Sequence, residues 1–297
     1  MKKTYVYTGL VTLMLCCLLP APAAQAAGRG ECLSLRSRIL AEPVAYCVLL
    51  PPGYDADKTR RFPVLYYLHG LGDNEQMFFR SGGWNLIQDL WERRELGEYI
   101  IVTPGAGSSF YLNSRDGRYR YEDFLLQEFV PVIETRYRIR AARAFRGVAG
   151  ISMGGYGALR LAFRRPDLFG AVATHSAAVM AELPAVETGS SARGRLRLFA
   201  EVFGSPVDRS FWDRNNPVAL ARSAGVSGLK IYFDCGSQDE YGFDSGAQAL
   251  HNLLVSRRVT HEFHLYPGGH NWRYFAEHLP ASLEFQSRAF GLGSAVR

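Results

Sequence analysis

The chain has 297 residues, of which 47% are hydrophobic, 13% aromatic and 21% charged. This composition excludes a disordered chain, and the length is sufficient for one large α/β domain. The net charge is +6, but the basic residues are scattered over 115–146 and 193–197. We interpret them as a solvated face, so no nucleic-acid partner is expected.

The first 26 residues have the features of a secretory signal peptide. Two lysines precede an apolar run, 10–19, that is too short to span a bilayer comfortably, and Ala24-Gln25-Ala26 is a small-x-small cleavage site. Cleavage after Ala26 leaves 32 basic and 28 acidic residues, a net charge of +4. We expect an exported, periplasmic or secreted protein with no stable membrane span, in which 27–297 form a single domain. An uncleaved membrane anchor is the alternative.

Three cysteines follow the predicted cleavage site. Cys32 and Cys47 flank two predicted short strands around the turn Ala41-Glu42-Pro43, and folding this hairpin about its midpoint brings position 32 opposite 47. Export permits a disulfide between them, and two buried thiols are the alternative. Cys235 is then free and buried. No cysteine or histidine pattern has metal-ligand spacing, so no metal site is expected.

Apolar runs and amphipathic segments alternate along the rest of the chain. Beyond the hairpin and the strand before Ser152, strands are expected at 62–68, 99–104, 169–176, 229–234 and 260–265. Besides the helix after Ser152, helices are expected at 84–97, 121–136, 244–256 and 273–290. This alternation predicts the α/β class: a mostly parallel central sheet with helices on both faces, preceded by an N-terminal antiparallel hairpin. Residues 177–226 interrupt the alternation and are predicted to form a lid that shapes the substrate pocket.

Ser152 is the centre of the most informative motif. It lies in Gly150-Ile151-Ser152-Met153-Gly154, between a short apolar run and a segment of helical character that stops at Pro166. This pattern matches the G-x-S-x-G nucleophile elbow, in which glycines allow a strand and a helix to approach closely around a strained serine. The alternative is a glycine-rich turn that opens a core helix.

The strand expected at 62–68 runs into His69-Gly70-Leu71-Gly72. Hydrolases with a serine elbow place their second oxyanion donor after such a strand. The two glycines allow the chain to bend so that the Leu71 N–H faces the pocket. The side chain of His69 is expected to be a core histidine bonded to a backbone carbonyl.

A serine hydroxyl needs a general base, and that base needs an orienting acid. Of the histidines after Ser152, only His270 lies on a glycine-rich loop directly after a predicted strand. Asp239 occupies the equivalent loop after the preceding strand, which favours it over the competing Asp234 inside the strand. The order Ser, Asp, His is typical of this class of hydrolase.

These segments resemble the esterase D family of α/β-hydrolases. That family includes S-formylglutathione hydrolases, acetylxylan and feruloyl esterases, and the antigen 85 mycolyltransferases. The matching segments cover nearly all of the chain after the predicted signal peptide: Tyr67-Leu68-His69-Gly70, Ser109-Phe110-Tyr111, Tyr121-Glu122-Asp123-Phe124, Gly150-Ile151-Ser152-Met153-Gly154-Gly155-Tyr156-Gly157-Ala158, Gly236-Ser237-Gln238-Asp239 and Gly268-Gly269-His270-Asn271-Trp272.

The resemblance implies a catalytic mechanism. Ser152 is the nucleophile, His270 the general base and then acid, and Asp239 its orienter. The backbone N–H groups of Leu71 and Met153 form the oxyanion hole, and an acyl-enzyme is resolved by water without a cofactor. Pocket-lining roles are implied for four aromatic residues, with core packing as the alternative for each: Trp84, Phe110, Tyr111 and Trp272.

The implied function is an exported serine carboxylesterase that acts on small or carbohydrate-linked acyl esters. Three alternatives use the same triad: an acyltransferase, a peptidase, or a thioesterase of the S-formylglutathione hydrolase kind. Export argues against the last, because glutathione thioesters belong to the cytosol. A non-catalytic ligand-binding protein is a further alternative, and the oligomeric state stays open.

Overall fold

The computed structural model describes residues 27–183, 199–200, 202–226 and 228–293. The predicted signal peptide and residues 184–198 of the predicted lid lie outside these described residues. Within the described ranges, no helix is both long enough and apolar enough to cross a membrane.

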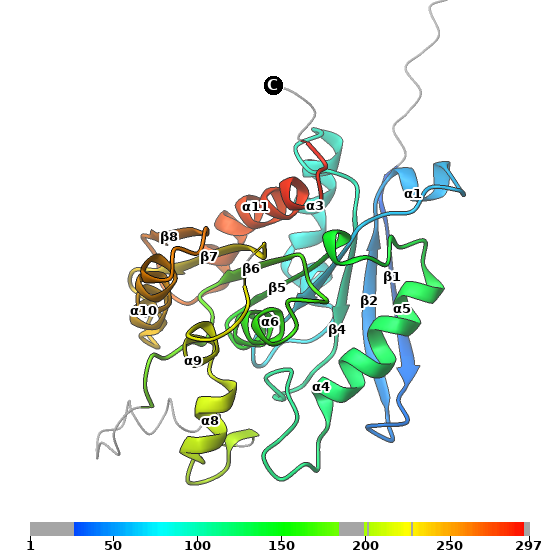
Figure 1. Cartoon of the computed structure of the whole chain (residues 1–297). Helices are drawn as coiled ribbons and strands as arrows, with labels where there is room; N and C mark the ends of the chain where they lie inside the picture. Colours follow the sequence, from blue (N-terminus) through cyan, green and yellow to red (C-terminus); the bar gives the residue numbers. More distant parts are fainter. Residues whose placement is uncertain (1–26, 184–198, 201, 227, 294–297) are drawn as a thin grey trace, which may run out of the picture.

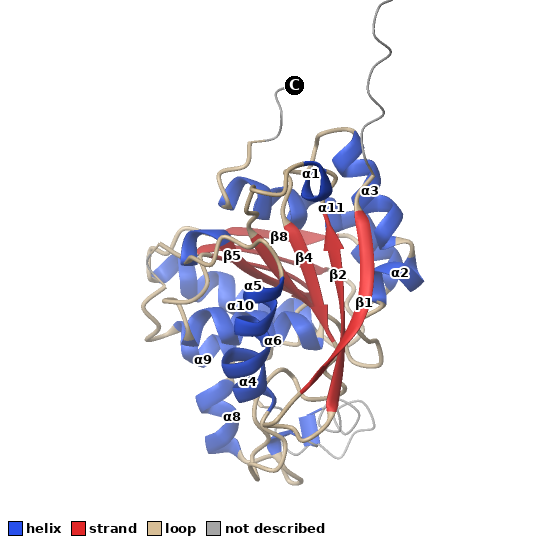
Figure 2. Ribbon diagram, turned by 90° about the vertical axis from the view of Figure 1, so that its right-hand side faces the viewer, coloured by secondary structure: helices blue, strands red, loops and turns tan. Residues whose placement is uncertain are grey.

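One mixed sheet organises the molecule, with the strand order β1-β2-β4-β3-β5-β6-β7-β8 (Figures 1 and 2). The β1–β2 and β2–β4 pairs are antiparallel and all later pairs are parallel. The predicted fold class, with its N-terminal antiparallel hairpin, is therefore confirmed. The strands are β1 (Arg29–Arg36), β2 (Pro43–Leu50), β3 (Val64–Leu68), β4 (Ile100–Pro104), β5 (Arg146–Ile151), β6 (Ala171–His175), β7 (Lys230–Gly236) and β8 (Glu262–Tyr266).

Helices cover both faces of the sheet. The described helices are α1 (Gly53–Ala56), α2 (Met77–Ser81), α3 (Gly83–Glu92), α4 (Tyr121–Phe124), the π-helix η1 (Leu125–Phe129), α5 (Val130–Arg136), the 3₁₀-helix η2 (Arg143–Phe145), α6 (Met153–Arg164), α8 (Arg209–Asn215), α9 (Pro217–Ala221), α10 (Phe243–Ser256) and α11 (Trp272–Ala289). Helices α2, α3 and α11 pack on one face, and α4 to α6 with α8 to α10 pack on the other (Figures 1 and 2).

Strand β3 shows why the sheet is covered on both sides. Val64, Tyr66 and Leu68 join the core cluster under α6, while Leu65 and Tyr67 join the cluster under α3 and α11. Successive side chains of a strand point to opposite faces of the sheet. A strand without polar residues must therefore be covered by other elements on both faces. This is the physical basis of the continuous apolar run in the sequence.

Two predicted helices differ from those in the structure. The helix expected at 84–97 ends at Glu92, because Arg94 adopts the left-handed conformation (φ 57°) and the Leu96 N–H bonds back to the Leu90 carbonyl. The helix expected at 121–136 is interrupted by η1, where the Val130 N–H reaches the Leu125 carbonyl five residues back. This wider turn directly precedes Pro131, which lacks an N–H and would clash in a regular helix.

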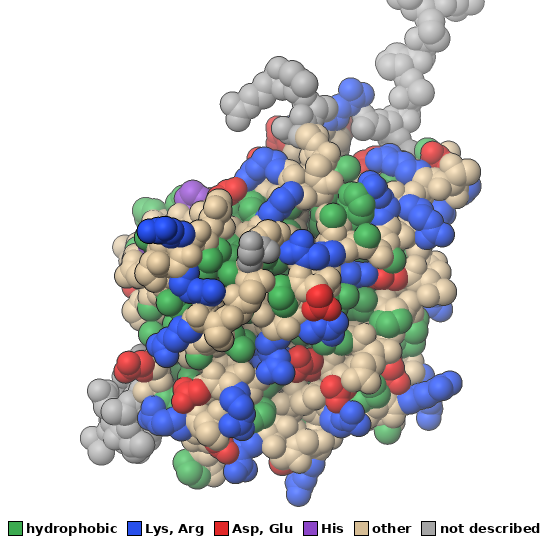
Figure 3. Space-filling model, viewed as in Figure 1, with side chains coloured by type: hydrophobic (Ala, Val, Ile, Leu, Met, Phe, Trp, Pro, Cys, Tyr) green, Lys and Arg blue, Asp and Glu red, His purple; other side chains and the backbone are tan. Residues whose placement is uncertain are grey.

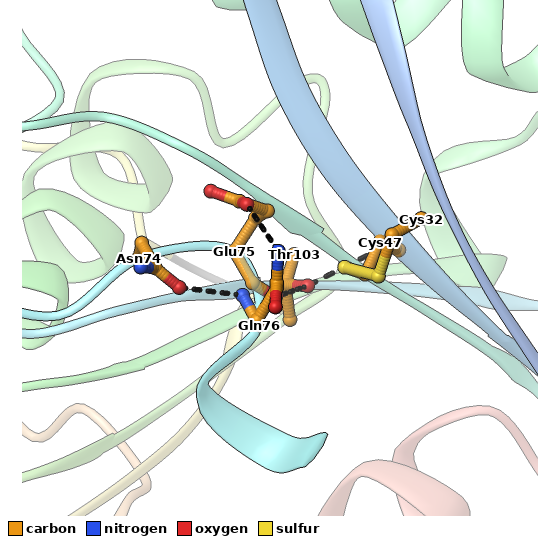
Figure 4. The surroundings of a disulfide bond; sticks show 6 residues. All are labelled: Cys32, Cys47, Asn74, Glu75, Gln76 and Thr103. Atoms are coloured by element: carbon orange, nitrogen blue, oxygen red, sulfur yellow. Dashed lines mark hydrogen bonds between the residues drawn. A yellow bond between two sulfur atoms is a disulfide. The ribbon is translucent and has the colours of Figure 1, made fainter. Parts of the chain in front are cut away.

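The N-terminal hairpin pairs Cys32 with Cys47 in register, and a disulfide joins the two residues. Figure 4 shows that this bond lies beside Thr103 of β4. The Thr103 hydroxyl donates to the Glu75 carbonyl at 2.5 Å and lies 3.4 Å from the Cys47 carbonyl oxygen (Figure 4). Through Thr103, the hairpin is therefore tied to the loop between β3 and α2, which contains Glu75.

Candidate active site

The turn at Ser152 connects β5 directly to α6. Ser152 has φ 55° and ψ −115°, which is a strained conformation for a residue with a side chain. A Cβ atom on Gly154 would lie 2.0 Å from the Leu68 carbonyl oxygen, and one on Gly150 would lie 2.4 Å from the Gly154 carbonyl carbon. Only glycine fits at both positions, so the strand and the helix meet closely around the serine.

The loops after β7 and β8 bring an acid and a base to this serine. The His270 Nε2 atom lies 2.9 Å from the Ser152 Oγ, and the His270 Nδ1 lies 2.7 Å from Asp239 Oδ2. A carboxylate only accepts hydrogen bonds, so Nδ1 carries the proton and the Nε2 lone pair faces the hydroxyl. This arrangement can remove the serine proton as the oxygen attacks a substrate.

Asp239 is buried and its carboxylate is held on both oxygens. The Tyr241 backbone N–H donates to Oδ1 at 3.0 Å, and the buried Cys235 thiol lies 3.7 Å from Oδ2. Burial raises the pKa of the Cys235 thiol well above its usual value, so Cys235 stays protonated. A fixed carboxylate fixes the tautomer and the orientation of the imidazole.

The imidazole of His270 is surrounded by aromatic rings that the sequence analysis missed. The rings of Tyr241, Phe243 and Phe275 lie with their centroids 4.9, 5.5 and 5.3 Å from it. Phe243 and Phe275 are buried, but Tyr241 is 41% exposed and stacks on Phe243. Tyr241 stands two positions after the acid Asp239 in the sequence, and this spacing is the signal from which its place beside the base could have been predicted. Tyr241 is thus an exposed ring directly beside the base.

The residues expected to donate to an oxyanion are Met153 and Leu71. Met153 is the first residue of α6, where a backbone N–H has no partner within the helix. Leu71 lies in the loop after β3 and its side chain is 40% exposed. Its neighbour Gly70 is so close to the serine that an added Cβ would lie 3.6 Å from the Ser152 Cβ.

The four aromatic residues considered for the pocket separate into two groups. Phe110 and Tyr111 are fully buried, and the Tyr111 hydroxyl bonds to the His69 carbonyl at 3.1 Å, which fits the core-packing alternative. Trp84 is half-buried between the rings of Phe79 and Trp91. Trp272 lies two residues after His270 in the sequence and is also half-buried. Its indole N–H donates to the Ser81 carbonyl at 2.9 Å.

The competing acid, Asp234, serves a different histidine. Its carboxylate lies 2.8 Å from His175 Nδ1 and accepts bonds from the hydroxyls of Tyr232 at 2.9 Å and Tyr274 at 2.7 Å. Burial and the charge of Asp234 raise the pKa of both tyrosines well above the usual value. His175 Nε2 in turn lies 2.7 Å from the Ser282 Oγ. This second Ser–His–Asp cluster is buried, and it is joined to the elbow through the backbone, because the Ser152 N–H donates to the His175 carbonyl at 3.0 Å.

His69 has the structural surroundings expected from the sequence. It is fully buried, and its Nε2 accepts the Ala106 N–H at 3.0 Å while Nδ1 lies 2.8 Å from the Gly70 carbonyl. Burial lowers the pKa of His69, which keeps the ring neutral. The ring therefore joins the loops that follow β3 and β4.

A cavity of about 730 Å³ lies at the opposite end of the sheet. It is lined by residues at the starts of β7 and β8, including Lys230 and Glu262, and by Arg288 of α11. Functional groups of parallel sheets gather at the carboxyl ends of the strands, where Ser152, Asp239 and His270 lie. Among the described residues, no group of three or more His, Cys, Asp or Glu side chains could hold a metal ion.

The strand order, the strained serine between a strand and a helix, and the loop positions of the acid and base define an α/β-hydrolase. Residues 37–285 match the model of the putative esterase family, and the chain belongs to that family.

Several relatives share this similarity. An esterase of Mycobacterium tuberculosis is 31% identical over 245 residues, covering 76% of this chain and 52% of the relative, so the chain spans about half the length of that relative. An endo-1,4-beta-xylanase/feruloyl esterase of Xylanibacter ruminicola is 33% identical over 130 residues, covering 41% of this chain and 18% of the relative.

Two solved structures are also similar. A ferulic acid esterase is 29% identical with a TM-score of 0.75, covering 90% of this chain and 100% of the other. An S-formylglutathione hydrolase from Agrobacterium tumefaciens has a TM-score of 0.70 at 18% identity, covering 89% of this chain and 96% of the other. The second likeness shows the fold alone.

Proposed function

We propose that this chain is a serine carboxylesterase with Ser152 as nucleophile, His270 as general base and acid, and Asp239 as the orienting acid. One observation carries the proposal: the continuous hydrogen-bonded series from Ser152 Oγ through His270 to Asp239, at 2.9 and 2.7 Å. The esterase family membership and the strained conformation of Ser152 support it.

The proposed reaction needs no cofactor. His270 Nε2 takes the proton of Ser152 as Oγ bonds to the ester carbonyl carbon, and the negative oxygen is stabilised by the N–H groups of Met153 and Leu71. The imidazolium then returns its proton to the departing alkoxide, which leaves an acyl-enzyme. Water attacks this intermediate by the same sequence of proton transfers, with His270 again as base.

The proposed substrates are small or carbohydrate-linked acyl esters. Relatives named feruloyl or ferulic acid esterase support a carbohydrate-linked ester with an aromatic acyl group. The exposed ring of Tyr241 beside His270 offers a surface on which such a group could stack. Trp272 stays a second candidate for the pocket wall. The proposal includes a role for residues 177–226 as a lid that shapes the substrate pocket.

The proposal also includes export after removal of residues 1–26. The Cys32–Cys47 disulfide supports it, because structural disulfides persist in oxidising compartments and are rare in the cytosol. A cytosolic glutathione thioester is for the same reason a less suitable substrate.

The nucleophile is tested with a fluorophosphonate probe, which reacts with activated serines. We expect the wild-type chain to be labelled and Ser152→Ala to be unlabelled, with a loss of kcat of about 10⁴- to 10⁶-fold. The matched control is Ser282→Ala, which removes the serine of the buried second cluster. A folded wild-type chain that takes no label would contradict the proposal and favour a ligand-binding protein.

The substrate class is tested with a panel of esters on the wild-type enzyme that has not been treated with the probe. The panel contains p-nitrophenyl acetate, methyl ferulate, acetylated xylan and a glutathione thioester. Turnover of the oxygen esters above the thioester supports the proposed class, and the reverse order would favour the thioesterase. Product analysis with added alcohol separates hydrolysis from acyl transfer.

A further inference from the structure

His270 is held at two points by two consecutive acids. Asp239 holds the imidazole through Nδ1, and Glu240 holds the main chain, because its Oε2 accepts the His270 backbone N–H at 2.7 Å. The same carboxylate lies against Gly269: a Cβ atom there would be 2.5 Å from Glu240 Oε1. Side-chain and main-chain anchors for the base therefore come from adjacent positions of the loop after β7.

The segment that carries the base needs such an anchor. It contains two consecutive glycines, and Gly268 has φ 141°, a conformation that residues with side chains rarely adopt. The Gln238 N–H bonds to the Gly268 carbonyl at 2.9 Å, and the ring of Tyr274 fills the space where a Gly268 Cβ would be. Glu240 adds the contact to His270 itself. Without it, the backbone N–H of the base loses its side-chain partner.

The position of this backbone determines the catalytic distances. The imidazole must stay within hydrogen-bond reach of both Ser152 and Asp239, and a displacement of about 1 Å at such a site can cost roughly 100-fold in rate. Both contacts depend on where the Cα of His270 lies, since the side chain has few rotatable bonds. A hydrogen bond to its own N–H is the most direct way to fix that point.

We propose that Glu240 is a positioning residue for the general base, acting through the backbone of His270 rather than on the substrate. The inference rests on the proposed esterase function of the Ser152 site.

The chemistry of Glu240 suits this role. The hydrogen bond from the His270 backbone holds the pKa of the Glu240 carboxyl below its usual range, so the acceptor is present throughout the neutral range. The charged or titratable groups that act on Glu240 are Asp239 and His270. Glu240 is exposed, so solvent screens its charge and the geometric contribution is expected to be larger than the electrostatic one.

Two substitutions separate the acceptor from the charge. Glu240→Gln keeps a side-chain oxygen at the same position but removes the charge, whereas Glu240→Ala removes both. We expect Glu240→Ala to lower kcat about 10- to 100-fold with little change in KM, and Glu240→Gln to stay within about 3-fold of wild type. Glu277→Ala, an exposed acid on α11, is the matched control and should leave kcat unchanged.

Rescue of kcat by the conservative Glu240→Gln variant, with KM unchanged in both variants, is the readout that a merely structural role would not give. Thermal unfolding of each variant checks that the fold is retained. An unchanged kcat in Glu240→Ala, or an equal loss in the Gln and Ala variants, would overturn the inference.

These outcomes are distinct from a failure of the proposed function. If Ser152 is not the nucleophile, the wild-type chain takes no fluorophosphonate label. If only the role of Glu240 is wrong, the wild type is labelled at Ser152 and the Glu240→Ala variant reacts at the same rate.

Discussion

Asp234 and Asp239 lie five residues apart, yet they reach different histidines. Asp234 is still within β7, where its side chain points toward α11 and meets His175, Tyr232 and Tyr274. Asp239 follows a turn in which its own N–H bonds to the Gly236 carbonyl, and this turn directs its carboxylate to His270. The location of each acid, in the strand or after it, determines its partner.

Substitutions of the two acids should therefore have different effects. Asp239→Asn is expected to lower kcat about 10⁴-fold with little loss of stability, because an amide favours the wrong imidazole tautomer. Asp234→Asn is expected to lower the free energy of unfolding by about 3 kcal/mol, because it disrupts a buried charged network. Single-turnover kinetics and urea unfolding measure the two effects. A loss of kcat confined to Asp234→Asn would reverse the assignment of the acid.

At the scale of elements, the elbow depends on contacts between segments that are distant in the sequence. Gly154 of α6 lies against the Leu68 carbonyl at the end of β3, and Gly155 lies against Ala177. The motif predicts a glycine at position 154, but only the assembled sheet shows which backbone it approaches. A proline within a helical segment is accommodated by a distortion, and the structure shows that at Pro131 this distortion is the π-helical turn η1 directly before it.

The glycine contact gives a test of the elbow. Gly154→Ala would place a methyl group 2.0 Å from a backbone oxygen that cannot move freely, and we expect a loss of about 3 kcal/mol or more in unfolding free energy. Gly70→Ala is the control beside the same serine, since its new Cβ would lie 3.6 Å from the Ile151 carbonyl oxygen and from the Ser152 Cβ, which is ordinary van der Waals contact. Urea unfolding followed by circular dichroism compares them. Equal midpoints in the two variants would show that the elbow is not tightly packed.

At the scale of the molecule, the described part of 177–226 is packed onto the elbow helix. Trp212 and Phe203 contact the ring of Tyr156, and the Tyr156 hydroxyl donates to the Asn215 carbonyl at 2.8 Å. The buried Arg160 joins Asn215 to Glu122 of α4. This segment therefore shares the main core through its aromatic residues.

The distribution of charged side chains on the surface matches the scattered positions of the basic residues in the sequence. On the face shown in Figure 3, Lys and Arg side chains are distributed over many elements, with acidic and apolar groups between them. Some basic residues of the chain have acidic partners, such as Arg115 with Asp208 and Arg165 with Asp167.

The proposed export concerns the whole chain and can be tested on it. We expect the protein recovered after export to begin at Ala27, with the Cys32–Cys47 disulfide closed and Cys235 reduced. Intact-mass measurement gives the site of cleavage, and repeating it after alkylation with and without reduction gives the state of the three cysteines. Retention of residues 1–26 in the exported protein would instead favour an uncleaved anchor.

The order of strands and helices, the hairpin register and the candidate serine, acid and base were accessible from the sequence alone, because they depend on local periodicity, glycine placement and loop position. The tertiary structure decided which side chains meet. Asp239 and His270 are 31 residues apart, and Glu240, Tyr241 and Phe275 reach the base only when the loops after β7 and β8 lie side by side. Such contacts follow from packing between elements that are distant in the sequence.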